Sequence, residues 1–351
     1  MREGERAWAF LTVSPHENAA VIEGILAYGI LSLDWEREHA TRRAVAGLRL
    51  FVPAGTSRPL RGRVLALSPG ARVEIYEWRE PDGPMKKVDP ADGGNLESRL
   101  MPRREVEMIL DSSRESVAQI RSLVPSASAA IETRVTSGAA ELAISFRGLE
   151  FARWNAQGVS FGLGDIRKNL SAATMPELTR LIRNLERHRK PETEKTNHAL
   201  YRAAPERWLE TLILEDPSRL DAQLDTRHLY SQVPAWAAGD RGMIGLLGVT
   251  KRGRLAVIEL KASEDIQLPI QAVDYWLRVR RHRNERNFQR HGYFAGIELD
   301  EKPPMVWLVA PGLRFHSATE KLSKYLSPEI QITRIGLNEN WRRGMEVIFR
   351  Q

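Results

Sequence analysis

The sequence predicts an α/β protein in three parts, each with its own sheet. Short apolar runs rich in Val, Ile and Leu alternate with helical segments along the chain. The 351 residues exceed what one compact core usually holds. Turn-forming residues crowd the stretch 80–95, and 187–197 is charged and free of apolar side chains. We therefore expect domains at 1–100, 101–190 and 198–351.

Six elements are expected in the first part. Ser14 and Pro15 begin a helix that extends to about residue 27, as is usual for helix N-termini. The predicted strands are 7–13, 29–35, 48–52, 63–67 and 72–78. Together they indicate an α/β or barrel-like domain. Its opening strand, Ser-Pro helix and Tyr-Gly-Ile strand resemble the PUA-like group, which implies a domain that reads nucleic acid or a ligand.

The second part predicts a small α+β domain with an antiparallel sheet. A helix over 103–123 places its apolar residues roughly along one face. Short strands separated by glycine turns follow, and a second helix closes the part. The predicted strands and helix are 129–136, 141–146, 151–154, 158–163 and 176–188.

The third part predicts a mixed central sheet flanked by helices. A helix over 206–214 is followed by two strands, a long helix and a further strand. The expected elements after the first helix are strands 243–249 and 255–261, helix 269–287, strand 305–310, helix 317–326, and strands 329–335 and 345–350.

An acid and a lysine stand at the end of the strand 255–261. Alternate residues of a strand point to one face, so Glu259 and Lys261 project side by side and Leu260 faces the other way. Carboxylates hold Mg²⁺, and a lysine beside a metal-bound water orients that water or stabilises charge on the phosphate. This triplet therefore indicates phosphodiester hydrolysis.

With these motifs in this order, the third part resembles the restriction-endonuclease-like, or PD-(D/E)XK, nuclease superfamily. Glu259 and Lys261 match its ExK motif, and Gln271 with Tyr275 matches the QxxxY of the RecB-type branch. Either Glu206 or Glu210 matches the acid on the first helix. The nearest likeness is to the C-terminal nuclease domain of archaeal and actinobacterial mismatch or branched-DNA endonucleases.

The resemblance implies a Mg²⁺- or Mn²⁺-dependent DNA endonuclease in DNA repair or defence, with DNA as its partner. The site residues that it implies are Glu259, Lys261, Gln271, Tyr275 and Glu206 in catalysis, with Glu259 and Asp240 holding the metal.

One position departs from the family pattern. Gly245 stands on the strand before Glu259, where the family usually carries a metal-bridging aspartate. Asp240 is the nearest acid, but it lies five positions upstream and faces the other way unless a bulge re-aims it. The alternative is therefore a degenerate nuclease fold that binds DNA or regulates without cutting.

The helix that carries Gln271 continues into a basic run. Guanidinium groups bind phosphates bidentately, so this run predicts a DNA-binding ridge; a merely solvated helix face is the alternative. The residues assigned to the ridge are Arg278, Arg281, Arg283 and Arg286.

The composition favours some binding partners and excludes some kinds of site. The net charge of +7 favours a polyanionic partner, and the absence of cysteine excludes thiolate metal sites and disulfides. No stretch approaches the roughly 20 apolar residues that span a bilayer, and the N-terminus does not look like a signal peptide. We expect a cytoplasmic protein without a membrane partner, and a homodimer is left open.

Overall fold

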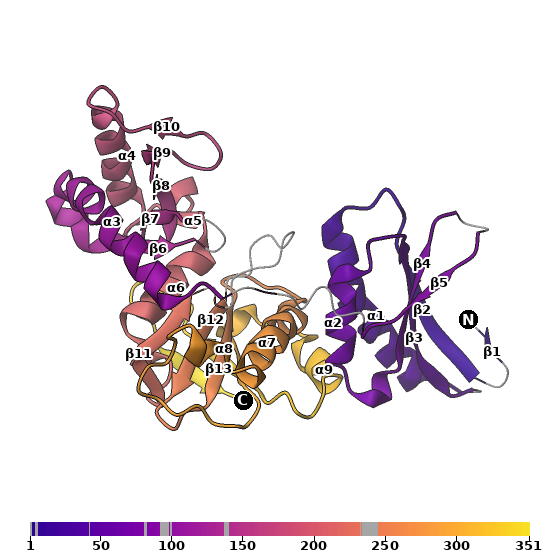
Figure 1. Ribbon diagram of the computed structural model, residues 1–351. Helices are drawn as coiled ribbons and strands as arrows, with labels where there is room; N and C mark the ends of the chain where they lie inside the picture. Colours follow the sequence, from indigo (N-terminus) through magenta and orange to yellow (C-terminus); the bar gives the residue numbers. More distant parts are fainter. Residues whose placement is uncertain are drawn as a thin grey trace.

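Three open sheets form the framework of the protein in the computed structural model (Figure 1). The structure describes residues 2–3, 6–41, 43–80, 83–91, 98, 100–136, 140–231, 233 and 245–351, leaving aside the side chains of residues 2, 3 and 6. Each sheet takes its strands from one continuous stretch of chain, so the predicted mixed α/β class is confirmed.

The first sheet has a parallel centre with antiparallel edges, in the order β1-β2-β3-β4-β5. Its strands are β1 Arg2–Glu3, β2 Arg6–Thr12, β3 Val45–Pro53, β4 Val73–Trp78 and β5 Lys86–Val88. Helices α1 (Ala19–His39) and α2 (Arg58–Leu65) lie on one side of the sheet (Figure 1). Because the sheet is open, the barrel-like alternative is wrong.

Two segments predicted as strands in this part are helical. Stretch 29–35 lies inside α1, and 63–65 closes α2. Leu26, Ile30 and Leu33 are fully buried at helical spacing, so their apolar run is the inner face of a helix. Gly29 is a site of close packing, because a Cβ there would lie 2.7 Å from Leu48 Cδ2.

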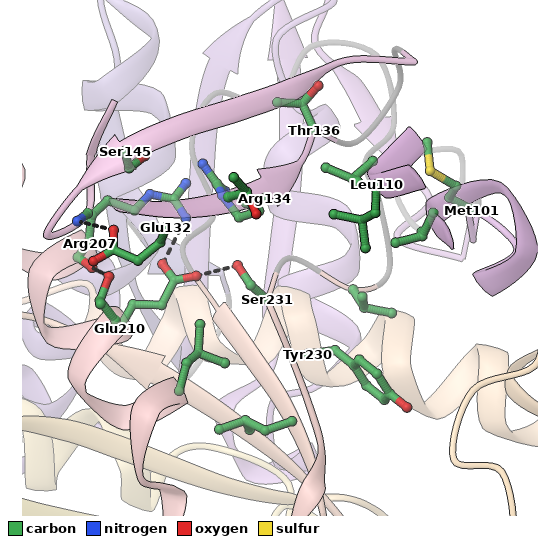
Figure 2. Close-up of a pocket in the computed structure, with 18 of the residues that line it drawn as sticks. Met101, Leu110, Glu132, Arg134, Thr136, Ser145, Arg207, Glu210, Tyr230 and Ser231 are labelled. Carbon is green, nitrogen blue, oxygen red and sulfur yellow. Dashed lines mark hydrogen bonds and ion pairs between the residues drawn. The ribbon is translucent and has the colours of Figure 1, made fainter. Parts of the chain in front are cut away.

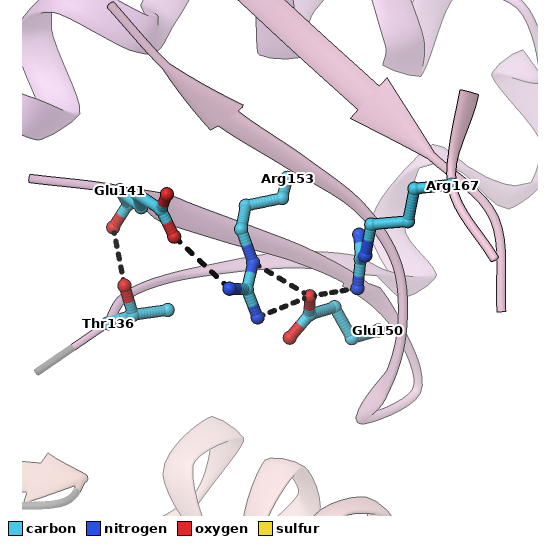
Figure 3. Close-up of polar contacts among 5 residues, drawn as sticks. All are labelled: Thr136, Glu141, Glu150, Arg153 and Arg167. Atoms are coloured by element: carbon cyan, nitrogen blue, oxygen red, sulfur yellow. Dashed lines mark hydrogen bonds and ion pairs between the residues drawn. The ribbon is translucent and has the colours of Figure 1, made fainter. Parts of the chain in front are cut away.

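The second sheet is antiparallel, as the sequence predicted, and its strands form a meander in the order β10-β9-β8-β7-β6. Its elements are α3 Arg103–Ser122, β6 Ile131–Val135, β7 Leu142–Phe146, β8 Leu149–Asn155, β9 Gly158–Phe161, β10 Lys168–Asn169 and α4 Met175–His188. A polar network crosses this sheet: Arg153 binds Glu141 at 3.1 Å and Glu150 at 2.9 Å, and Glu150 also accepts from Arg167 (Figure 3).

The third sheet is mixed, in the order β11-β12-β13-β14-β15-β16, with β13, β14 and β15 parallel. Its strands are β11 Leu224–Ser231, β12 Gly245–Thr250, β13 Leu255–Leu260, β14 Met305–Pro311, β15 Ile332–Leu337 and β16 Val347–Arg350. Strand β11 is absent from the sequence prediction. The longest helices of this part are α6 (Pro205–Glu215) and α7 (Leu268–Asn284).

Alternation along the strands assigns each helix of the third part to one face. Leu255 and Val257 share a hydrophobic cluster with α7, whereas Ile258 and Leu260 share another with α6.

The remaining short helices are α5 Ala199–Arg202, α8 Asn287–Arg290 and α9 Thr319–Lys324, with 3₁₀ turns η1 Pro69–Ala71, η2 Pro125–Ala130, η3 Pro217–Arg219 and η4 Gly312–Arg314.

The first and third parts share one hydrophobic core. The cluster around α1 and the first sheet continues without a break into the α7 side of the third sheet. Backbone hydrogen bonds cross the same boundary, from Ser68 N to the Tyr325 carbonyl and from Ser327 N to the Ala66 carbonyl, both at 2.8 Å.

Within the described residues, no helix has the length and apolar character needed to traverse a bilayer.

The charged stretch predicted as a linker contains a buried arginine. Arg189 is 0% exposed, and its guanidinium stacks over Trp208 with 4.7 Å between the guanidinium carbon and the ring centre. It donates to the backbone carbonyls of Phe146, Arg147, Leu200, Ala203 and Ala204. Arg189 therefore joins the second sheet to the start of α6, and this stretch is not simply solvated. The domain limits themselves stay a prediction.

Candidate functional site

Glu259 lies deep in the third sheet, on the side that faces α7. It follows Leu255 and Val257 on that face of β13 and is only 3% exposed. Within the described part of the chain, its Oε2 has no hydrogen-bond partner. Burial is the main cause that raises the pKa of this carboxyl to about 8, and the charge of Lys261 acts in the opposite direction. Glu259 is therefore mainly neutral at pH 7.

Gly245 pairs directly with Glu259 across β12 and β13. A Cβ built on Gly245 would lie 2.6 Å from Tyr275 Cε1 and 2.7 Å from its Cδ1. The tyrosine ring thus occupies the space that a side chain at position 245 would need. Tyr275 is 2% exposed, and its hydroxyl donates to the Val233 carbonyl. Burial raises the pKa of this phenol well above its ordinary value.

Lys261 lies at the more open end of β13. Its Nζ is 2.7 Å from Asp265 Oδ2, and its side chain is 19% exposed. Glu206 reaches the same end from α6, because its Oε1 accepts a hydrogen bond of 3.3 Å from the Ala262 amide. The structure therefore brings the Glu206 carboxylate to the backbone amide that follows Lys261.

Glu210, the other acid predicted on the first helix, is held by its neighbours. It is 3% exposed, its Oε2 lies 2.8 Å from Arg207 Nη1, and its Oε1 accepts from the Ser231 hydroxyl (Figure 2). Its negative charge contributes to the raised pKa of Glu259. Glu210 thus lies near the candidate site but is bound to Arg207 and Ser231.

The QxxxY pair lies on α7, with its two members in different environments. Tyr275 packs against Gly245, whereas Gln271 is half-buried one turn earlier. Between them Asp274 forms a buried ion pair with Arg63 of α2, with Arg63 Nη2 to Asp274 Oδ2 at 2.6 Å. The sequence analysis did not single out this pair. The only sequence signal for it is an acid inside an otherwise apolar stretch of helix.

The basic run that follows does not form one exposed ridge. Arg278 is 3% exposed, and Arg281 is half-exposed and lies 2.9 Å from Glu285. Arg283 donates to the backbone carbonyls of residues 301 and 302. Arg286 is exposed and has left-handed backbone, with φ of 55°, at the start of α8. Arg281 and Arg286 alone among these four remain accessible enough to meet a phosphate chain, and their role stays a prediction.

The side chains around Glu259 are the ones that would have to bind the expected Mg²⁺. The unpartnered Oε2 of Glu259 suits one metal ligand, but Tyr275 fills the space where a carboxylate from position 245 would stand. Among the described residues, no three His, Asp or Glu side chains gather in a way that would hold a metal. Asp240 lies outside those residues. The described side chains thus do not make a Mg²⁺ centre by themselves.

Neither the protein-family models nor the curated proteins contain a match to this chain.

Proposed function

We propose that this chain is a DNA-binding or regulatory protein on a restriction-endonuclease-like core whose cleavage centre is closed. The observation that carries the proposal is the contact of Tyr275 with Gly245, beside the buried Glu259. A phosphodiesterase of this type needs ionised carboxylates around its metal. Here one carboxylate is missing from the sequence and its space is filled.

The order of elements supports the nuclease-like ancestry in this proposal. Helix α6, the antiparallel strands β12 and β13 and helix α7 follow one another in the order that the resemblance names, with the unpredicted edge strand β11 between α6 and β12. The net charge of +7 supports a nucleic-acid partner. A non-cleaving protein on this core would retain the affinity for DNA and lack the chemistry.

The test is DNA binding by fluorescence anisotropy over a salt series, with single-stranded, duplex and branched DNA. We expect affinity that falls steeply with salt, because phosphate contacts release counterions. Replacing Arg281 and Arg286 together by Ala should weaken binding and flatten the salt slope. Arg343→Ala, on an exposed turn of the third part, is the matched control. Absence of binding to all three DNAs at low salt would refute the proposal.

A second candidate is the Mg²⁺- or Mn²⁺-dependent endonuclease. It is favoured by the position of Glu206, whose carboxylate accepts from the Ala262 amide just past the end of β13 and would serve as a migrated acid. In this version Lys261 orients the attacking water, and Gln271 supports the DNA backbone. Cleavage of any of the same DNAs that is lost in Lys261→Ala, with folding retained, would favour this candidate over the closed site.

A further inference from the structure

The two faces of the first sheet differ in what covers them. Leu48, Leu50 and Ile75 are fully buried and belong to the hydrophobic cluster around α1. In Figure 1, α1 and α2 lie on the same side of this sheet. Because side chains alternate along a strand, Arg49 and Phe51 point to the opposite side, called here the open face. Phe51 belongs to none of the three hydrophobic clusters formed by the described residues.

Aromatic rings cross the open face from strand to strand. Trp8 and Phe10 stand there on β2, Phe51 on β3, and Tyr76 and Trp78 on β4. Phe51 stacks on Tyr76 with 5.2 Å between ring centres, and Phe10 meets Phe51 edge-on at 6.5 Å. Phe10 is 52% exposed, whereas Tyr76 and Trp78 are half-buried. The rings therefore form one cluster, and part of it meets solvent.

The open face lacks the side chains that pack helices against this sheet. In the stretches 8–12, 47–53 and 74–78, its residues include no Val, Leu or Ile. Branched aliphatic side chains stand instead on the other face, under α1 and α2. Flat rings suit flat ligands, and nucleic-acid bases that are free of a partner strand stack on exposed aromatic side chains. The composition of the open face is thus typical of a base-stacking surface.

Glu74 is the acid among these rings, and its charge is compensated. Its Oε2 lies 2.9 Å from Arg49 Nε and accepts from the Tyr76 hydroxyl at 2.9 Å, and its Oε1 lies 2.6 Å from Lys87 Nζ. The Arg49 guanidinium in turn covers the Trp8 ring, with 4.2 Å between its carbon and the ring centre. Two cations share one carboxylate here, so this group has a positive excess.

The charges at the margins of the open face balance one another. Arg72, just before β4, and Arg79, just after it, are exposed. Glu80 and Asp89 are exposed acids beyond the ends of β4 and β5. Lys87 is 58% exposed, and its ion pair with Glu74 is weak enough to exchange for a phosphate because it lies near solvent. The open face therefore has a small positive excess, and its rings are the larger source of the expected affinity.

We propose that the open face binds single-stranded DNA, whose bases stack on Phe10, Tyr76 and Trp78 while its phosphates contact Lys87. A single strand is needed because paired bases stack on one another and do not present their faces. This proposal rests on the proposed function, which makes DNA the partner. It adds the form of the strand and a contact surface on a different sheet from that of Arg281 and Arg286.

Fluorescence anisotropy on the full chain tests the proposal with labelled oligothymidylate of about 12 nucleotides. An abasic strand of the same length keeps the phosphates and lacks the bases. We expect the abasic strand to bind at least about tenfold more weakly, because it has nothing to stack. Equal binding of the two strands would overturn the proposal, and tighter binding of oligouridylate than of oligothymidylate would overturn the assignment to DNA. This comparison uses the parent chain, so it does not depend on the folding of any variant.

Three variants locate the bound strand. Phe10→Ala removes the most exposed ring of the open face, and Phe10→Tyr restores a ring at the same point. Trp35→Ala is the matched control, because Trp35 is 56% exposed on α1. Phe10→Ala should bind oligothymidylate about tenfold more weakly and the abasic strand as the parent does. Phe10→Tyr and Trp35→Ala should bind both strands as the parent does. Equal affinity of Phe10→Ala and Trp35→Ala for oligothymidylate would refute the site.

Failure of this proposal and failure of the proposed function give different results. Salt-dependent binding of oligothymidylate and duplex DNA that is unchanged in Phe10→Ala would overturn the open-face site and leave the proposed function standing. Absence of binding to every DNA at low salt would overturn both.

Discussion

The ring of Tyr275 lies against the Cα of Gly245, and a Cβ at that glycine would approach Tyr275 Cε1 to 2.6 Å. Gly245 also pairs with Glu259 on the neighbouring strand. Position 245 thus has neither a carboxylate nor the room for one. The filled space at position 245 is therefore a stronger argument for a closed nuclease centre than the missing acid alone.

Gly245→Ala should destabilise the protein by about 1–3 kcal/mol, because the new methyl group forces the buried Tyr275 ring to move. Gly344→Ala is the control, since a Cβ there meets nothing within 4 Å and the change should cost only a few tenths of a kcal/mol. Urea unfolding of the two variants measures both costs. Equal stabilities would show that the ring is not fixed against Gly245.

Glu259→Gln should change how stability depends on pH. The pKa of the folded carboxyl is raised from 4.5 to about 8, so the unfolded chain loses its proton first as pH rises. The stability of the parent relative to Glu259→Gln should therefore be highest below pH 4.5. This stability difference should fall as pH rises from 4.5 to 8, by up to about 4 kcal/mol. A pH-independent difference in urea unfolding between the two proteins would mean that Glu259 ionises normally.

The Arg63–Asp274 ion pair should couple α2 to α7. Both side chains are nearly buried, and their charged atoms are 2.6 Å apart. Asp274→Leu alone should cost about 3–5 kcal/mol by leaving the arginine charge buried, whereas Arg63→Met with Asp274→Leu should cost much less. A double-mutant cycle by chemical denaturation measures the coupling. Simple additivity of the single changes would show that the pair is not coupled.

Arg189→Lys should be strongly destabilising although it preserves the charge. A guanidinium spans five backbone carbonyls and stacks on Trp208, and an ammonium cannot do both. We expect a loss of about 3 kcal/mol or more in thermal or chemical unfolding. Arg187→Lys, at an exposed position two residues earlier, should be close to neutral. A loss equal to that of the control would show that the network is dispensable.

The sequence predicted elements best where one periodicity was clear. The meander from β6 to β9 and the order of β13, α7 and β14 follow from alternating or helical apolar spacing with glycine turns. Stretch 29–35 was misjudged because a short apolar run fits a buried strand and a buried helix face equally well. Strand β11 was missed because it lies at the sheet edge and exposes polar residues such as Thr226 and Arg227.

The sequence named residues for a candidate site, but it could not predict their geometry. The spacing of Glu259 and Lys261 on one strand indicated which face they share. The burial of Glu259, by contrast, depends on packing between separate elements. Asp274 has its partner on α2, 211 positions earlier in the chain, and no local pattern points to it. Likewise, the contact of Tyr275 with Gly245 needs the helix and the sheet together.

The closed-site account is tested most directly by cleavage of labelled DNA with Mg²⁺ or Mn²⁺. The proteins to compare are the parent, Lys261→Ala, Tyr275→Ala and the double variant Gly245→Asp with Tyr275→Ala. The double variant supplies the missing carboxylate together with the room that it needs, and Tyr275→Ala controls for the lost ring. The account predicts no cleavage by the parent or the single variants, and cleavage by the double variant. Cleavage by the parent that Lys261→Ala abolishes would contradict it.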